Sequence, residues 1–210
     1  MSSPELPDRL IAYIDGFNLY HGLHDAAGHK WLWLDLAKLV QSLRPKQTLL
    51  QVKYFTASVL NEPAAQGRQD TYIAALDAAS GPLIETTMGR YQQKTKYCRN
   101  CNHPWHLYEE KETDVNIAVN LVADAAAQKA DSFMIVSADS DIAPAVRMAQ
   151  RLNPGAFFFA AFPPKRFSTE LKTLMPASFQ IGRGRVRSSM LPPTVTADDG
   201  RVHAQPAKWS

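Results

Sequence analysis

The sequence lacks the features that mark membrane, secreted and disulfide-stabilised proteins. It has only two cysteines in 210 residues, and no apolar run approaches the roughly 18 residues that a membrane-spanning helix needs. Its first residues, MSSPELPDRL, do not place an apolar segment after a basic one, as a secretory signal does. The net charge of +3 is too small to identify a polyanionic partner by itself. We therefore expect a cytoplasmic protein with no membrane partner.

Apolar residues are numerous enough for one sizeable core. Hydrophobic residues make up 45% of the chain and charged residues 20%, proportions that are typical of a single globular domain. Short apolar runs alternate with segments of helical spacing, which predicts an α/β fold with helices flanking a parallel sheet of about five strands. The predicted strands are residues 9–14, 49–56, 82–87, 132–137 and 155–161. The predicted helices are residues 31–43, 63–79, 113–130, 141–152 and 167–174.

The chain is expected to divide into a domain, an insertion and a tail. Residues 1–181 form the predicted domain, with an inserted loop or hairpin at 88–111, where periodicity stops and basic, aromatic, cysteine and histidine residues mix. Beyond residue 181 the sequence is rich in Gly, Pro, Ser and charged residues. Such a composition buries little apolar surface, so residues 182–210 are predicted to be a basic, mobile C-terminal tail.

Acidic residues follow two predicted strands and begin one predicted helix. Asp15 comes directly after the first strand, and Asp139 and Asp141 follow the fourth. Asp114 begins the helix before the fourth strand. Ligands of open α/β sheets bind outside the carboxyl ends of the strands, so Asp15, Asp139 and Asp141 would meet in one crevice if the first and fourth strands are neighbours. There they would raise one another's pKa, and a hard cation such as Mg²⁺ would offset the repulsion.

Each of these aspartates alone also fits a turn or a helix-capping role. Their joint placement is harder to explain by capping and favours a metal site. Two other acids, Asp124 and Asp131, are interpreted as surface residues.

Three segments carry the clustered acids: IAYIDGFNLY, EEKETDVNIAVNLVADA and FMIVSADSDIAPAVR. From Arg9 to Phe162 the chain resembles the NYN domain family, a bacterial branch of the PIN-like nuclease superfamily. The resemblance implies a PIN-like (Rossmannoid) parallel sheet and a ribonuclease that depends on Mg²⁺ or Mn²⁺. By position in the motifs it implies metal-binding or catalytic roles for Asp15, Asn18, Asp114, Asp139 and Asp141. It also matches Ser137 to the first residue of an SxDSD motif.

The expected reaction is hydrolysis of an RNA phosphodiester bond. One or two metal ions held by Asp15, Asp114 and Asp139 would lower the pKa of a bound water, which attacks phosphorus. No GxxxxGK[ST] phosphate loop is present. Two alternatives stay open: a non-catalytic nucleic-acid-binding or regulatory module on the same fold, and a small-molecule phosphatase, although IDGFN lacks the second aspartate of a DxDx[TV] motif.

The insertion contains both cysteines in one CxxC. Cys98, Cys101, His103 and His106 could supply four tetrahedral ligands to a structural Zn²⁺, and metal binding would help to order an irregular segment. The alternative is a pair of reduced cysteines on a loop with solvent-facing histidines. A redox role is disfavoured, because the Asn-His-Pro that follows does not begin a helix.

Basic and aromatic residues interleave in the same insertion. Basic side chains neutralise phosphates and aromatic rings stack on unpaired bases, so this segment is expected to hold single-stranded or structured RNA near Asp114. The alternative is ordinary solvated loop charge. The residues expected to contact nucleic acid are Lys94, Lys96, Arg99, Trp105, Lys111 and, beside the acids, Ser137.

Overall fold

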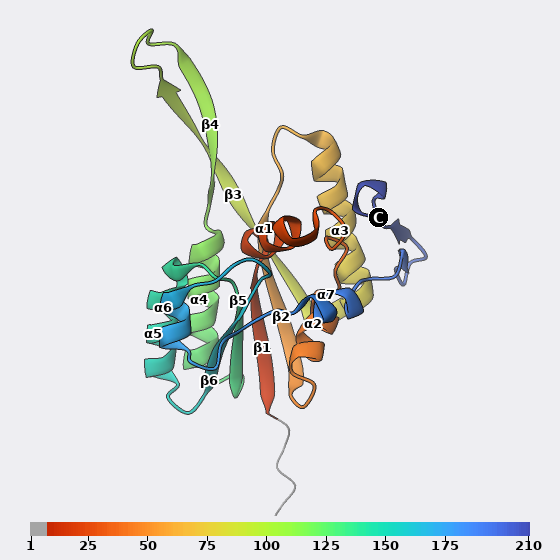
Figure 1. Ribbon diagram of the computed structural model, residues 1–210, viewed down its shortest axis with the longest axis vertical. Helices are drawn as coiled ribbons and strands as arrows, with labels where there is room; N and C mark the ends of the chain where they lie inside the picture. Colours follow the sequence, from red (N-terminus) through yellow and green to blue (C-terminus); the bar gives the residue numbers. More distant parts are fainter. Residues whose placement is uncertain (1–7) are drawn as a thin grey trace, which may run out of the picture.

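A seven-stranded sheet forms the centre of the fold (Figure 1). The computed structural model describes residues 8–210, except for the side chains of His106, Leu107, Glu109 and Glu110. The strand order is β4-β3-β2-β1-β5-β6-β7, and all neighbours run parallel except the β3–β4 pair. The strands are β1 (Arg9–Asp15), β2 (Thr48–Ala57), β3 (Ile84–Tyr97), β4 (Pro104–Lys111), β5 (Ser132–Val136), β6 (Phe157–Phe162) and β7 (Phe179–Gln180).

The predicted α/β class with a largely parallel sheet is confirmed, but the predicted number of strands is wrong. The five predicted strands correspond to β1, β2, β3, β5 and β6. β7 has only two residues, too few for any periodicity to show. β4 pairs with the outer half of β3, which is largely exposed, so neither segment has the alternation of a half-buried strand.

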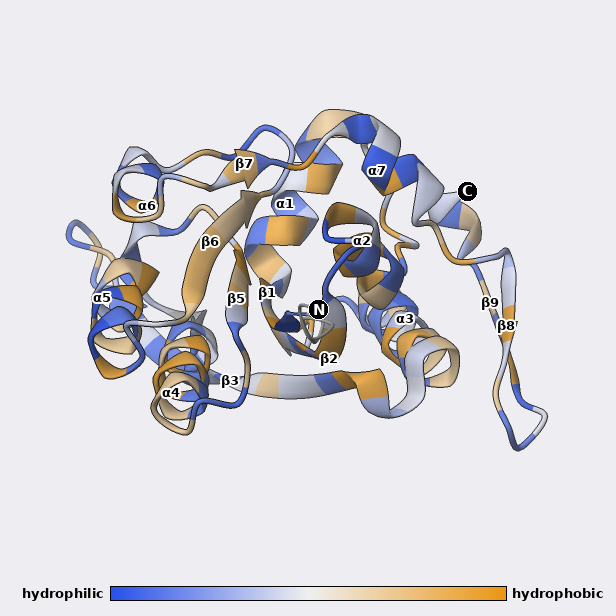
Figure 2. Ribbon diagram, turned by 90° about the horizontal axis from the view of Figure 1, so that it is seen from below, coloured by the Kyte–Doolittle hydropathy of each residue, from blue (hydrophilic) through white to orange (hydrophobic). Residues whose placement is uncertain are grey.

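Helices cover both faces of the sheet (Figure 2). One apolar cluster joins α1, α2, α3 and α7 to the sheet, and a second joins α4, α5 and α6 to its other face. Within residues 8–210, no helix combines the length and the apolar character needed to cross a membrane. The helices are α1 (Gly16–Ala27), α2 (Leu36–Leu43), α3 (Pro63–Ser80), α4 (Thr113–Ala126), α5 (Ala143–Leu152), α6 (Thr169–Leu174) and α7 (Arg183–Ser188). Short 3₁₀ turns are η1 (Gly81–Leu83), η2 (Ser140–Ile142) and η3 (Ala207–Trp209).

Capping residues set the observed starts of the helices. The helix predicted at 31–43 begins only at Leu36, because the side chain of Asp35 accepts from the backbone N–H of Lys38 at 2.9 Å. Leu36, Leu39 and Val40 then recur at helical spacing and are fully buried. Burial of each such side chain contributes about 1.5–3 kcal/mol, so packing of this face rather than propensity holds α2 in place.

Helix α1 is missed by the sequence prediction. Two glycines and two histidines in its 12 residues weaken the helical pattern. It forms because Asp15 caps it: the backbone N–H of Asn18 donates to Asp15 Oδ1 at 3.0 Å. Gly16 lets it start close to β2, since a Cβ there would lie 2.7 Å from the carbonyl oxygen of Phe55. The helix therefore begins at the carboxyl edge of the sheet.

The segment beyond Ile181 packs on the domain, unlike the mobile tail that the sequence predicts. It contains α7, a hairpin of β8 (Thr194–Thr196) and β9 (Val202–Ala204), and η3. Trp33 Nε1 donates to the carbonyl of Pro192 at 2.8 Å, and Val186 and Trp209 are buried in the core cluster. The buried residues of this segment are single apolar residues in a polar sequence, so composition does not reveal that the segment packs on the domain.

The insertion at 88–111 forms a long hairpin. β3 pairs with β2 as far as Gly89 and with β4 from Arg90 onward. The hairpin extends well beyond the body of the fold (Figure 1).

Asp124, interpreted from the sequence as a surface residue, is buried in α4. It is 1% exposed, and the Nζ atoms of Lys53 and Lys129 lie 2.6 Å from its two carboxylate oxygens. The hydroxyl of Tyr13 donates to the same carboxylate at 2.7 Å. An acid in an Ala- and Val-rich helix gives no sequence signal of such partners, because they come from β1, β2 and the segment after the helix.

Candidate active site

The carboxyl ends of β1 and β5 form the topological switch point of the sheet. β1 pairs with β2 on one side and with β5 on the other, and ligands of open α/β sheets bind in the crevice at such a point. Asp15 is the last residue of β1, and Ser137 follows the end of β5, where Val136 pairs with Ile14. The fold therefore brings the first and third acidic motifs side by side.

Asp15 is a buried carboxylate held by neutral donors. It is 4% exposed. The backbone N–H of Asn18 donates to its Oδ1 at 3.0 Å, and the hydroxyl of Ser137 donates to its Oδ2 at 2.9 Å. Burial raises the pKa of Asp15 and the charge of Asp139 raises it further, while the hydrogen bonds from Asn18 and Ser137 oppose the shift. None of these described partners is a cation.

The loop after β5 is fixed by the same small network. Asn18 Oδ1 accepts from the backbone N–H of Ala138 at 3.0 Å. Ser137 Oγ accepts from the backbone N–H of Asp139 at 3.0 Å, and Asp139 Oδ1 accepts from that of Asp141 at 2.9 Å. These bonds tie the start of α1 to the loop and hold the two acidic motifs together.

A cavity of about 280 Å³ opens at this point. Asp114 reaches it from the first turn of α4, where the helix dipole favours a carboxylate. Asp141 is exposed outside the cavity. Ser137, predicted to contact nucleic acid, is fully buried and donates to Asp15 instead. The predicted residues that line the cavity are Asp15, Asn18, Asp114 and Asp139.

Sequence reasoning missed several residues of the same cavity. His21 lies one turn after Asn18 on α1, a spacing that would have shown only if α1 had been recognised. Arg166 comes from the loop between β6 and α6, and its Nη2 lies 2.6 Å from Asp25. It brings a positive charge to the cavity, with no signal in the sequence. The missed lining residues are Phe17, His21, Thr113 and Arg166.

The oxygen donors of the cavity suit a hard divalent cation bound through water. Among the described residues, no three His, Cys, Asp or Glu side chains are grouped closely enough to hold one ion together. Mg²⁺, however, keeps several waters and is usually bound by only one or two carboxylates. Asp15 and Asp139, whose charges interact, fit such a water-rich site, with Asp114 lining the same cavity.

The other predicted nucleic-acid contacts lie on the hairpin rather than in the cavity. Lys96 is opposite Trp105 in the β3–β4 register, and alternation places Lys94 and Lys111 on the same face. Trp105 is 45% exposed. We call this set, Lys94, Lys96, Trp105 and Lys111, the basic strip. Arg99 lies at the hairpin turn.

The two cysteines lie together at the same turn. Backbone N–H groups of Cys101 and Asn100 and the Cys101 side chain hydrogen-bond to the Cys98 thiol and lower its pKa. His103 is exposed and, among the described side chains, does not complete a group of three metal ligands with them. The side chain of His106, the fourth predicted ligand, lies outside the described residues.

Three comparisons relate this chain to known proteins. The family model for the NYN domain matches residues 9–178. A curated relative, 6-hydroxy-3-succinoylpyridine 3-monooxygenase HspA of Pseudomonas putida strain S16, is 30% identical, with 68% of this chain and 55% of that protein covered. The chain thus spans about half the length of this relative.

A solved structure has the same fold. The protein of unknown function VPA0982 from Vibrio parahaemolyticus superposes with a TM-score of 0.57 at 18% identity, covering 87% of this chain and 98% of that one. At this identity the likeness concerns the fold alone.

Proposed function

Because the chain belongs to the NYN domain family, whose fold is nuclease-like, we propose that it is a metal-dependent ribonuclease that hydrolyses RNA phosphodiester bonds. One observation carries the proposal: Asp15 is buried beside Asp139 with a raised pKa, and its described partners are all neutral. Perturbed carboxylates in a cavity mark functional sites. A cation bound at Asp15 and Asp139 would offset both the burial and the repulsion.

The residues of the cavity have separate tasks in this proposal. Bound Mg²⁺ or Mn²⁺ would supply a water of lowered pKa and stabilise the leaving oxygen. Asp15 and Asp139 would hold the ion, and Asp114 would orient a water beside it. Arg166 binds a phosphate oxygen, because a guanidinium donates strong charge-assisted hydrogen bonds. Asn18 is a positioning residue, since it bonds to the loop after β5.

The RNA would reach the cavity along the hairpin. The basic strip combines cations that neutralise phosphates with a ring that stacks on an unpaired base. β4 ends at Lys111, and α4, which carries Asp114, begins at Thr113. A strand bound on the basic strip would therefore lead toward the acids.

The test is a cleavage assay on matched RNA and DNA oligonucleotides with Mg²⁺, with Mn²⁺ and with a chelator. We expect metal-dependent cleavage of RNA that Asp139→Asn removes. The matched control is Asp198→Asn, which changes an exposed acid in the β8–β9 turn. If the protein binds RNA but cleaves none with either metal, the fold serves as a non-catalytic nucleic-acid-binding module and the ribonuclease proposal fails.

A second candidate function comes from the named relative. The monooxygenase name of the 30% identical protein indicates oxygen insertion into a substituted pyridine as a reaction this chain could share. The chain spans only about half of that relative, so the reaction is a proposal here. It would need O₂ and an electron donor as co-substrates. Oxygen consumption with a succinoyl-substituted hydroxypyridine and a reduced nicotinamide or flavin separates this function from RNA cleavage.

We also propose that the thiol pair at the hairpin turn binds zinc. Two adjacent sulfurs, one of lowered pKa, form half of a tetrahedral site, and His103 and His106 are the remaining donors within reach along the chain. Metal analysis of protein purified without added zinc tests this. We expect one equivalent that Cys98→Ser removes; substoichiometric zinc unaffected by that change would rule the site out.

A further inference from the structure

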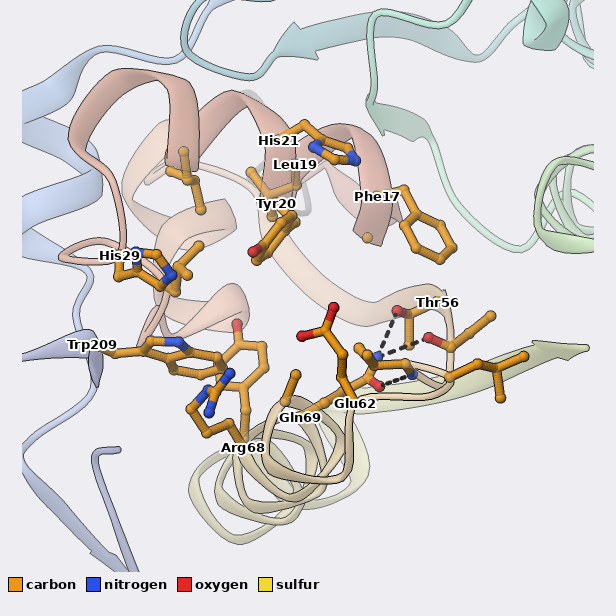
Figure 3. Close-up of a pocket in the computed structure, with 18 of the residues that line it drawn as sticks. Phe17, Leu19, Tyr20, His21, His29, Thr56, Glu62, Arg68, Gln69 and Trp209 are labelled. Atoms are coloured by element: carbon orange, nitrogen blue, oxygen red, sulfur yellow. Dashed lines mark hydrogen bonds between the residues drawn. The ribbon is translucent and has the colours of Figure 1, made fainter. Parts of the chain in front are cut away.

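A second and larger cavity lies next to the carboxylate cavity. Its volume is about 620 Å³, within the range of pockets that enclose small organic ligands. α1, the end of β2, α3 and η3 surround it (Figure 3). Phe17 and His21 line both cavities. A ligand in the larger cavity would therefore lie beside the acids without contacting them.

Aromatic rings form much of its wall. Tyr72 stands edge-on to Trp209 with ring centroids 5.9 Å apart, and edge-on to Tyr54 at 6.5 Å. Tyr20 faces the cavity from α1 (Figure 3). Tyr91 adds a ring from the base of the hairpin. Flat rings of this kind favour a planar ligand, because aromatic stacking adds to the burial of apolar area.

Cations gather at one side of the same cavity. Arg68 and Lys208 line it together with His29. Burial lowers the pKa of His29, and the positive charges of Lys208 and Arg68 lower it further, so the three groups share one electrostatic environment. Among the described residues, neither Arg68 nor Lys208 has a salt-bridge partner. Two cavity cations that form no salt bridge within the described residues favour an anionic ligand.

Glu62 adds a carboxylate to the lining of the cavity. Its carboxylate points from the start of α3 into the cavity (Figure 3). A carboxylate accepts hydrogen bonds only, so it suits an N–H or hydroxyl on the ring of a ligand. Arg68 and Lys208 would pair with the charged end of the same molecule.

We propose that this cavity binds a planar aromatic ring carrying an anionic substituent, a carboxylate or a phosphate. Two sources share this chemistry: a nucleotide unit and a free aromatic acid. The inference does not depend on cleavage, because Asp15, Asp114 and Asp139 do not line this cavity.

The test is calorimetric titration with two matched pairs of probes in the presence of a chelator. The pairs are adenosine 5′-monophosphate with adenosine, and indole-3-acetate with indole-3-acetamide. We expect at least one anion to bind about tenfold or more tightly than its neutral partner, since a bond to a charged group contributes that much. Binding of the nucleotide alone assigns the cavity to a nucleotide unit, and binding of the indole acid alone assigns it to free aromatic acids.

Two variants make the test specific. Arg68→Gln should weaken binding of the preferred anion about tenfold and leave the neutral probe unchanged. Lys38→Gln, which changes an exposed cation on α2, should leave the affinity for both the anion and the neutral probe unchanged. Arg68 is half-buried on α3 and Lys38 is exposed on α2, and matched melting temperatures confirm that both variants are folded. The proposal is overturned if no anion binds, if anion and neutral partner bind equally, or if Arg68→Gln has no effect.

Discussion

Two aspartates of this protein are buried almost equally, yet their surroundings shift their pKa values in opposite directions. Asp124 is 1% exposed and Asp15 is 4% exposed. Burial alone would raise the pKa of Asp124, but hydrogen bonds from Lys129, Lys53 and Tyr13 outweigh it and lower the pKa. Burial raises the pKa of Asp15, whose described partners are neutral and whose charged neighbour is Asp139.

The difference separates a structural carboxylate from one available for chemistry. Removing a charge from water costs several kcal/mol unless nearby partners offset it. At Asp124 the protein supplies those partners from β1, β2 and the segment after α4. At Asp15 it supplies only neutral donors, although the position lies at the switch point of the sheet. The unfavourable electrostatics remaining at Asp15 are what a bound cation would relieve.

The largest expected difference between the two sites is in catalysis. Asp15→Asn should reduce metal-dependent RNA cleavage by more than about 100-fold, because loss of an outer-shell partner of a metal already costs about 10–100-fold. Asp124→Asn should leave the rate of the folded protein within about threefold, since Asp124 does not line the cavity. Initial rates on one RNA substrate at a temperature where both variants are folded measure this. Equal losses of cleavage rate in both variants would mean that Asp15 affects cleavage only by stabilising the fold.

The next difference is in stability. Asp124→Asn should lower the free energy of unfolding by about 3–5 kcal/mol, because it leaves the buried Lys53 ammonium without its carboxylate partner. Asp131→Asn is the matched control: its pair with Arg9 is about half exposed, so its loss should cost less than about 1 kcal/mol. Urea denaturation of the three proteins measures both. Similar small losses in the two variants would contradict the buried network.

The two aspartates should also give stability opposite dependences on pH. The pKa of Asp15 in the folded protein lies above the ordinary 3.8. Its contribution to the free energy of unfolding is therefore favourable at low pH and is lost as the pH rises through the pKa of the folded state. Asp15→Asn should therefore stabilise the metal-free protein near pH 7 and do so less toward pH 4; each kcal/mol gained would raise the melting temperature by about 2–4 °C.

For Asp124 the pH dependence of stability has the opposite sign. The pKa of Asp124 in the folded protein lies below the ordinary 3.8. Its contribution to the free energy of unfolding is therefore present above pH 3.8 and is lost as the pH falls through the pKa of the folded state. The destabilisation by Asp124→Asn should shrink below about pH 4. Thermal unfolding between pH 3 and 8 in a chelator measures both trends. If the melting temperatures of the two variants change with pH in parallel, the pKa values of Asp15 and Asp124 are not shifted in opposite directions.

The smallest expected effect concerns RNA binding far from either aspartate. Lys94→Gln combined with Lys96→Gln should reduce the dependence of log K on log salt by about 1.4 for single-stranded RNA, about 0.7 for each phosphate that a lysine no longer neutralises. Replacement of Arg151 and Lys38, exposed cations on α5 and α2, is the control. Binding titrations over a range of salt concentrations measure the slope. An unchanged slope would remove the basic strip from the proposed RNA path.

The fold was predictable where burial imposes a pattern. β1 and β5 are buried along nearly their whole length, and runs of this kind identify central strands. α1 and the C-terminal segment have no such pattern. The first depends on a cap at Asp15 and a close approach at Gly16, and the second on single anchors such as Trp209. Interactions of this kind depend on the tertiary structure and leave no periodicity in the sequence.

The candidate site was predictable in its motifs but not in its electrostatics. Asp15, Asn18, Asp114 and Asp139 follow from strand ends and from the family motifs, and the structure places all four at one cavity. Arg166 was missed because it reaches the cavity through a loop after β6. The contrast between Asp15 and Asp124 was also missed, because charge compensation depends on partners from other elements.

Metal binding tests the central claim most directly. Calorimetric titration of the metal-free protein with Mn²⁺ should show binding that Asp15→Asn weakens at least about tenfold and that Asp124→Asn leaves unchanged. The wild-type protein should also gain thermal stability as Mn²⁺ is added, because the ion binds the folded state. If Asp15→Asn binds Mn²⁺ as tightly as the wild type does, Asp15 does not hold a cation and the account of this site is wrong.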